Sequence, residues 1–119
     1  MVAVIDDDES YRFALQRLLK SAGLSVESFG SAEAFLSSGQ QNETGCLIAD
    51  IRMPGMSGLE LQSKLNYDHC PIPTIFITAH GDEKMRLQAM RGGAVKFLTK
   101  PFDSATLLEA VQLALKVEG

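Results

Sequence analysis

Residues 2–9 read VAVIDDDE: four apolar residues, most of them β-branched, are followed at once by four acids. A short apolar run that is stopped by polar residues is typical of a buried β-strand. Apolar residues at helical spacing follow from Tyr11 to Ala22, and Gly23 ends that segment. This stretch therefore predicts a strand and then an amphipathic helix, the first half of a βαβ unit.

The same order of strand and helix recurs along the rest of the chain. Further apolar runs lie at residues 24–29, 46–49, 74–78 and 95–98, and helical segments follow them at residues 31–36, 59–65, 82–91 and from Asp103 or Ser104 onward. The polar residues 37–44 are predicted to form a loop. This alternation predicts an α/β fold, a doubly wound parallel sheet with helices on both faces and right-handed crossovers. No repeat or linker divides the chain, so residues 1–119 are interpreted as one domain.

The composition argues against several classes of protein. The 119 residues are 45% hydrophobic, which is too apolar for disorder, and 11 Lys+Arg against 15 Asp+Glu give a net charge of −4, which disfavours nucleic-acid binding. No apolar run approaches the roughly 18 residues that span a bilayer, and the first residues lack the basic start of a signal peptide. The cysteines, Cys46 and Cys70, lack metal-ligand spacing. We therefore expect a reduced, cytoplasmic setting without membrane contact.

Polar residues follow the predicted strands at the point where each strand ends. Asp6 and Asp7 come directly after the first strand, Asp50 ends the third, Thr78 ends the fourth, and Lys100 lies just past the fifth. The carboxyl ends of parallel strands meet at one edge of a sheet, where ligands bind in this fold class. If the first and third strands are neighbours, the three aspartates converge there.

Clustered carboxylates repel one another and cost stability unless they bind a cation. Mg²⁺ prefers oxygen ligands, and a metal, a lysine and a threonine hydroxyl together suit a transferring phosphoryl group, with a carboxylate as its acceptor. Simpler interpretations exist for single residues. Asp8 and Glu9 fit an ordinary helix N-terminus, Asp50 could be a cap, and Lys100 could be a surface charge.

The sequence resembles the receiver domain of two-component response regulators over essentially its whole length. The resemblance rests on motifs in the same order and spacing: VIDDD at residues 4–8, LIADIRMPGMSG at 47–58, ITA at 77–79 and KPF at 100–102. The stretches TAHGD (78–82) and GAVKF (93–97) further resemble the branch of nitrogen-fixation transcription regulators. The fold implied is flavodoxin-like, with strand order 2-1-3-4-5.

The resemblance implies a role for each acid of the predicted site. Asp50 would be the phosphoacceptor, taking a phosphoryl group from the phosphohistidine of a sensor histidine kinase. Asp7, Asp50 and the backbone carbonyl of Arg52 would bind Mg²⁺ directly, and Asp6 would act through a metal-bound water; Mn²⁺ or Ca²⁺ could substitute.

The resemblance also implies how the phosphoryl group would be sensed. Thr78 would hydrogen-bond to it, Lys100 would pair with it, and Phe97 would turn inward when Thr78 moves. The peptide bond between Lys100 and Pro101 is expected to be cis. Changes would reach the surface of the fourth helix, fifth strand and fifth helix. That surface would control a homodimer or a C-terminal output domain, and the resemblance implies transcription as the output.

Further interpretations concern the residues around this set. Arg52 and His80 are predicted to flank the path of the water that hydrolyses the acyl phosphate, and so to set its lifetime; an exposed loop position is the alternative for His80. Met85 and Met90 are interpreted first as core residues and second as part of an interface.

Three other functions use similar residues. A metal-dependent phosphohydrolase with an aspartyl nucleophile typically needs a second carboxylate beside the nucleophile, but Ile51 and Arg52 follow Asp50. A flavin-binding module is disfavoured because the acids at residues 6–9 would repel a phosphate. A protein-binding receiver without phosphorylation is disfavoured by the complete residue set. The domain is therefore expected to be a phosphorylation switch and not a turnover enzyme.

Overall fold

The five strands predicted from the sequence form one parallel sheet, in the order β2-β1-β3-β4-β5. The computed structural model describes residues 1–117. Its elements are β1 (Val2–Ile5), α1 (Glu9–Ser21), β2 (Val26–Phe29), α2 (Ala32–Ser38), the 3₁₀ turn η1 (Gln41–Glu43), β3 (Cys46–Asp50), α3 (Gly58–Tyr67), β4 (Thr74–Thr78), α4 (Glu83–Arg91), β5 (Lys96–Thr99) and α5 (Ser104–Val117). The predicted doubly wound α/β fold and its strand order are confirmed.

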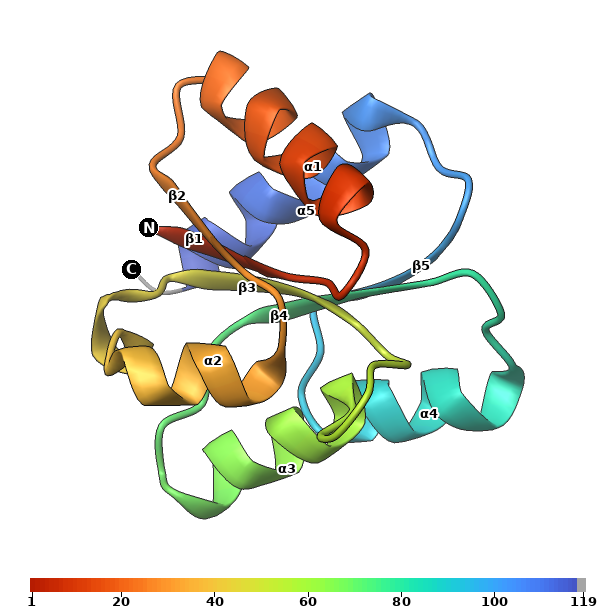
Figure 1. The fold of residues 1–119 in the computed structure, drawn as a ribbon. Helices are drawn as coiled ribbons and strands as arrows, with labels where there is room; N and C mark the ends of the chain where they lie inside the picture. The colour runs from red at the N-terminus through yellow and green to blue at the C-terminus, as the bar shows by residue number, and fades with distance from the viewer. Residues whose placement is uncertain (118–119) are drawn as a thin grey trace.

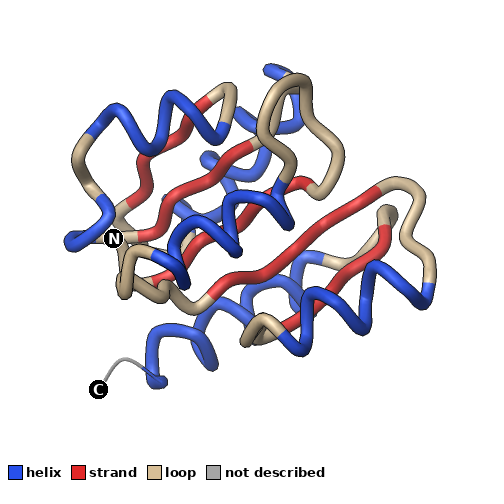
Figure 2. The backbone as a smooth tube through the Cα atoms, turned by 90° about the horizontal axis from the view of Figure 1, so that it is seen from below, coloured by secondary structure: helices blue, strands red, loops and turns tan. Residues whose placement is uncertain are grey.

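Helices cover both faces of the sheet. Figure 1 shows α1 and α5 on one face and α2, α3 and α4 on the other, and Figure 2 shows the strands lying side by side between them. Alternate residues of a strand face opposite sides. In β1, Ala3 and Ile5 pack in the core cluster shared with α2, α3 and α4, whereas Val2 and Val4 pack in the cluster shared with α1 and α5. β1 and the interiors of β3 and β4 are apolar because both of their faces are buried.

Short polar side chains start the helices where the sequence places them. The side chain of Asp8 accepts a hydrogen bond from the Tyr11 amide, at 3.1 Å, so Asp8 is the N-cap of α1. Ser31 caps α2 and Asp82 caps α4 in the same way. Ser57 starts α3 with a reciprocal capping box. Capping bonds of this type each contribute about 1 kcal/mol, and they fix where the loops at the carboxyl edge end.

The structure differs from the sequence prediction in one loop and at the boundaries of several elements. Residues 37–44, predicted as loop, contain the end of α2 and the 3₁₀ turn η1. Strands β2 and β5 begin later than predicted, at Val26 and Lys96, because the start of each strand depends on pairing with its neighbour. The bond between Lys100 and Pro101 is cis, as expected. Within residues 1–117, every helix is too short or too polar to cross a lipid bilayer.

Candidate functional site

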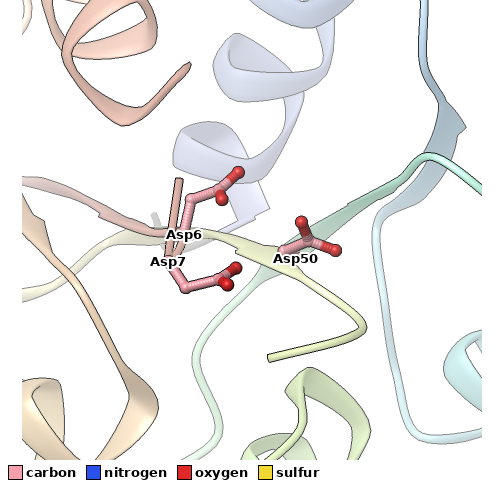
Figure 3. Close-up of side chains that lie close together, drawn as sticks. All are labelled: Asp6, Asp7 and Asp50. Atoms are coloured by element: carbon pink, nitrogen blue, oxygen red, sulfur yellow. The ribbon is translucent and has the colours of Figure 1, made fainter. Parts of the chain in front are cut away.

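Three aspartates from distant parts of the chain meet at the carboxyl edge of the sheet. Asp50 is the last residue of β3, and Asp6 and Asp7 follow β1, which pairs with β3 so that Ile5 lies opposite Ala49. One carboxylate oxygen from each aspartate lies within 4.8 Å of the others. Figure 3 shows the carboxylates of Asp6 and Asp7 pointing towards the side on which Asp50 lies. The predicted convergence is confirmed, and the parallel pairing of β1 with β3 produces it.

The environment of Asp6 suits a bound cation. Its side chain is fully buried, and only Oδ1 has a hydrogen-bond donor, the Asp8 amide at 2.9 Å. The second oxygen, Oδ2, accepts no hydrogen bond from any residue in the described part of the chain. Burial raises the pKa of Asp6, and the charges of Asp50 and Asp7 add to the effect. A buried carboxylate oxygen that accepts no hydrogen bond, beside two further carboxylates, is what a hard cation such as Mg²⁺ can bind.

Lys100 supplies positive charge to the same site. Its Nζ lies 3.5 Å from Oδ2 of Asp6 and 3.4 Å from Oδ2 of Asp50. Burial alone would lower the pKa of Lys100, but the charges of Asp6 and Asp50 outweigh it, so that the pKa is raised. The ammonium therefore stays charged at neutral pH. The Lys100 amide also donates to the Thr78 carbonyl, at 2.8 Å, and this bond ties the end of β5 to that of β4.

Thr78, the last residue of β4, and Phe97 of β5 lie close to each other at the β4–β5 side of the site. Thr78 is 1% exposed, and its hydroxyl accepts a hydrogen bond from the His80 amide at 3.3 Å. Phe97, from β5, is half-buried. Both side chains lie against Gly81, where a Cβ atom would be 2.8 Å from Cε1 of Phe97 and 3.0 Å from Cγ2 of Thr78. The ring and the threonine are thus close enough for one to respond to the other.

The loop after β3 is fastened to α2. Glu33 accepts a hydrogen bond from the Met56 amide at 2.9 Å. Gly55, with φ at +76°, lies against the same carboxylate. The hydrogen bond from Met56 holds the pKa of Glu33 below its ordinary value. This loop carries Arg52, whose amide donates to Oδ1 of Asp50 at 3.2 Å.

The structure places the remaining predicted residues as follows. The side chains of Arg52 and His80 are exposed, Arg52 in the loop after β3 and His80 in the loop after β4. Met85 is half-buried against the core, whereas Met90 is 39% exposed, so the core interpretation is wrong for Met90. Helix α4 buries only Ala89 fully, because its apolar face is narrow.

Three residues near the site were missed by sequence reasoning. Glu33 holds the loop described above. Arg12 donates from Nη1 to the Asp6 carbonyl at 2.8 Å. Tyr11 lies under Lys100, whose Nζ is 4.0 Å from the centre of the ring. The signal available for Arg12 and Tyr11 was their position on the first turn of α1, directly beside the acidic run; for Glu33 the sequence holds none.

Comparison with known proteins decides the family. The model of the response regulator receiver domain matches residues 2–112. The chain belongs to this family. Among curated proteins, the receiver domain is 49% identical over 114 residues to nodulation protein W of Bradyrhizobium diazoefficiens, with 96% of this chain and 50% of that protein covered. It is 46% identical to the transcriptional regulatory protein FixJ of Azorhizobium caulinodans, with 96% and 54% covered.

Solved structures agree with this assignment. The receiver domain matches the response regulator StyR with a TM-score of 0.91 and 49% identity, covering 98% of this chain and 59% of that one. It matches the FixJ-N structure with a TM-score of 0.87 and 41% identity, covering 97% and 92%. The chain spans about half the length of these curated relatives.

Proposed function

We propose that this receiver domain accepts a phosphoryl group on Asp50 from the phosphohistidine of a sensor histidine kinase, and thereby switches a transcription regulator. One observation carries the proposal: Asp50, with its side chain 12% exposed, lies beside Asp6, Asp7 and the charged Lys100. This arrangement surrounds the Asp50 carboxylate with a lysine that can neutralise a transferred phosphoryl group and with two further carboxylates that can hold a cation. The names of the relatives, which include a transcriptional regulatory protein, support the proposed output.

The acidic cluster would hold Mg²⁺. Asp7, Asp50 and the backbone carbonyl of Arg52 would bind the ion directly, and Asp6 would act through a bound water; Mn²⁺ or Ca²⁺ could take its place. Oδ2 of Asp6 accepts no hydrogen bond from residues 1–117, and the ligand set consists of oxygen atoms only; both observations support this fit. When bound, the ion supplies positive charge to the phosphoryl oxygens.

The chain's own residues carry the transfer. A carboxylate oxygen of Asp50 attacks phosphorus, the P–N bond of the phosphohistidine breaks, and the electron pair leaves with the imidazole nitrogen, which gives an acyl phosphate on Asp50. Lys100, already paired with Asp50, follows the charge onto the phosphoryl oxygens. The Thr78 hydroxyl donates to one of these oxygens, and this movement frees it from the His80 amide that it now contacts.

Phosphorylation of Asp50 would change the position of the Phe97 side chain. When Thr78 shifts, the Phe97 ring would fill the space that Thr78 vacates, and the surface of α4, β5 and α5 would change with it. That surface exposes apolar side chains, namely Leu87, Met90 and Leu113, and would control a homodimer or an output domain.

The lifetime of the acyl phosphate is proposed to depend on Arg52 and His80. Both side chains are exposed, Arg52 in the loop after β3 and His80 in the loop after β4. The absence of an acid at residues 51 and 52 supports a switch and not a turnover hydrolase.

A cytoplasmic, reducing location is proposed for the domain. Both cysteines are free thiols. Burial raises the pKa of Cys46 to about 12, so that thiol stays protonated and unreactive at neutral pH.

Intact-protein mass spectrometry with acetyl phosphate and Mg²⁺ tests the proposal. We expect a gain of one phosphoryl group in the wild type and none in Asp50→Asn. The matched control Asp68→Asn changes an exposed aspartate at the end of α3 and should still be phosphorylated. Equal labelling of Asp50→Asn would refute the role of Asp50. Sustained release of phosphate from small phosphoesters would favour the hydrolase instead.

A further inference from the structure

Lys100 is held from the side of α1 by an aromatic ring. Its Nζ lies 4.0 Å from the centre of the Tyr11 ring, which is half-buried on the first turn of α1. The same ammonium lies near Oδ2 of Asp6 and Oδ2 of Asp50. Lys100 is therefore enclosed by two carboxylates and one ring, and its side chain is only 21% exposed.

The ring makes a contact that the carboxylates do not make. The Lys100 distances to Asp6 and Asp50, 3.5 and 3.4 Å, are longer than those of a strong charge-assisted hydrogen bond, so these contacts alone leave the ammonium loosely held. An ammonium over the face of an aromatic ring is attracted by the ring's quadrupole, and the attraction increases when water is excluded. The ring also limits the many rotamers that a lysine otherwise samples.

Neighbouring side chains of α1 do not offer the same contact. The guanidinium of Arg12 is bound to the Asp6 carbonyl and stacks over the ring of Phe13. Phe13 itself is 48% exposed on the outer side of the helix. Within residues 1–117, the ring of Tyr11 is the only aromatic ring over which the Lys100 ammonium lies.

We propose that Tyr11 is a positioning residue that keeps the Lys100 ammonium aimed at the phosphoryl site. The face of the ring carries this role, and the hydroxyl does not. The inference rests on the proposed function of the same site, because the consequence of a misplaced Lys100 is slower phosphoryl transfer. Lys100 stabilises charge on the phosphoryl oxygens in the transition state. When its side chain adopts rotamers that point into solvent, part of that stabilisation is lost.

Nuclear magnetic resonance on the metal-free protein tests the contact without any phosphoryl chemistry. Protons on the carbon next to Nζ lie over the ring and should resonate upfield of those of exposed lysines; Lys100→Arg assigns them. We expect the upfield shift to persist in Tyr11→Phe and to disappear in Tyr11→Leu. Tyr67→Leu is the matched control, because it makes the same change at an 83% exposed tyrosine of α3. A shift that survives in Tyr11→Leu would overturn the inference.

Kinetics then tests the consequence. With acetyl phosphate and Mg²⁺, we expect phosphorylation of Tyr11→Leu to be about three- to tenfold slower than wild type, and that of Tyr11→Phe to stay within about twofold. A Tyr11→Phe variant as slow as Tyr11→Leu, or a Tyr11→Leu variant as fast as wild type, would refute the role of the ring. If Tyr11→Leu does not fold, Tyr11→Met removes the ring and keeps an apolar chain of similar length, with the same outcomes expected.

The two proposals fail in distinguishable ways. If wild-type protein takes up no phosphoryl group, the proposed function fails, yet the proton shifts still decide whether the ring holds Lys100. If wild type is phosphorylated, but Tyr11→Leu keeps both the upfield shift and the wild-type rate, only the role of Tyr11 fails.

Discussion

The middle of the sheet and its carboxyl edge bury their side chains in opposite ways. In the middle, residues such as Ile48 and Phe76 are fully buried among apolar neighbours. At the edge, Asp6 and Asp50 are buried beside one another, and one oxygen of Asp6 accepts no hydrogen bond within residues 1–117. The middle of the sheet supplies stability, whereas the edge gathers carboxylates whose negative charge one lysine, Lys100, compensates only in part. Substitutions in the two regions should therefore act in opposite directions.

Substitutions in the middle of the sheet should cause the largest loss of stability. Phe76→Ala should lower the free energy of unfolding by about 3–5 kcal/mol, because it removes a fully buried ring and leaves a cavity. Urea denaturation measures this change. Tyr67→Ala, at an exposed ring, should stay within about 0.5 kcal/mol of wild type. If the two variants lose similar stability, the middle of the sheet is not where the fold derives its strength.

At the edge, a divalent cation should stabilise the folded protein. Mg²⁺ at about a hundred times its dissociation constant should add about 2.7 kcal/mol, because the unfolded chain lacks the assembled site. Thermal unfolding with and without Mg²⁺ measures the effect. Asp7→Asn should lose most of it, and Asp68→Asn should keep it. Full stabilisation of Asp7→Asn would place the ion elsewhere.

Removing the charge of Asp6 from the edge should change the free energy of unfolding by a smaller amount, and should raise it rather than lower it. Burial raises the pKa of Asp6 in the folded, metal-free protein. The contribution of Asp6 to stability is therefore complete below its unfolded pKa of about 3.9, and it is lost as the pH rises through the folded value. Without metal, Asp6→Asn should be more stable than wild type at neutral pH, and the advantage should shrink in acid.

Chemical denaturation in a chelator across the acid range measures that difference. Asp103→Asn, which changes an exposed aspartate before α5, is the control and should show no such trend. An Asp6→Asn variant that is less stable than wild type at neutral pH would mean that the buried carboxylate is already compensated.

The smallest effect concerns the loop that borders the edge. Glu33→Ala should free the Met56 amide, whereas Glu33→Gln retains an acceptor oxygen and should keep the bond. Hydrogen exchange at Met56 should become several-fold faster only in Glu33→Ala. The hydrogen bond lowers the pKa of Glu33, so the protection is present above the unfolded pKa, near 4.3, and is lost as the pH falls through the folded value. Unchanged exchange in Glu33→Ala would show that the loop holds its shape by itself.

Local sequence patterns predicted much of this molecule for a physical reason. Residues 2–9 specify a buried strand and then a capped helix, and both features depend on neighbours in sequence. The starts of β2 and β5 could not be predicted accurately from the sequence, because pairing with the adjacent strand decides where each strand begins. The turn at residues 41–43 was missed, because a polar segment offers no periodicity to read.

The sequence by itself determined which groups reach the carboxyl edge, since the end of a parallel strand is a fixed place in the sheet: Asp6, Asp7, Asp50, Thr78 and Lys100. Tertiary structure alone decided what surrounds them. Tyr11 meets Lys100, and Glu33 meets Met56, across chain separations that no periodic pattern encodes. These contacts arise because packing two helices onto the sheet brings first turns and loops together, and packing depends on the shapes of all the side chains at once.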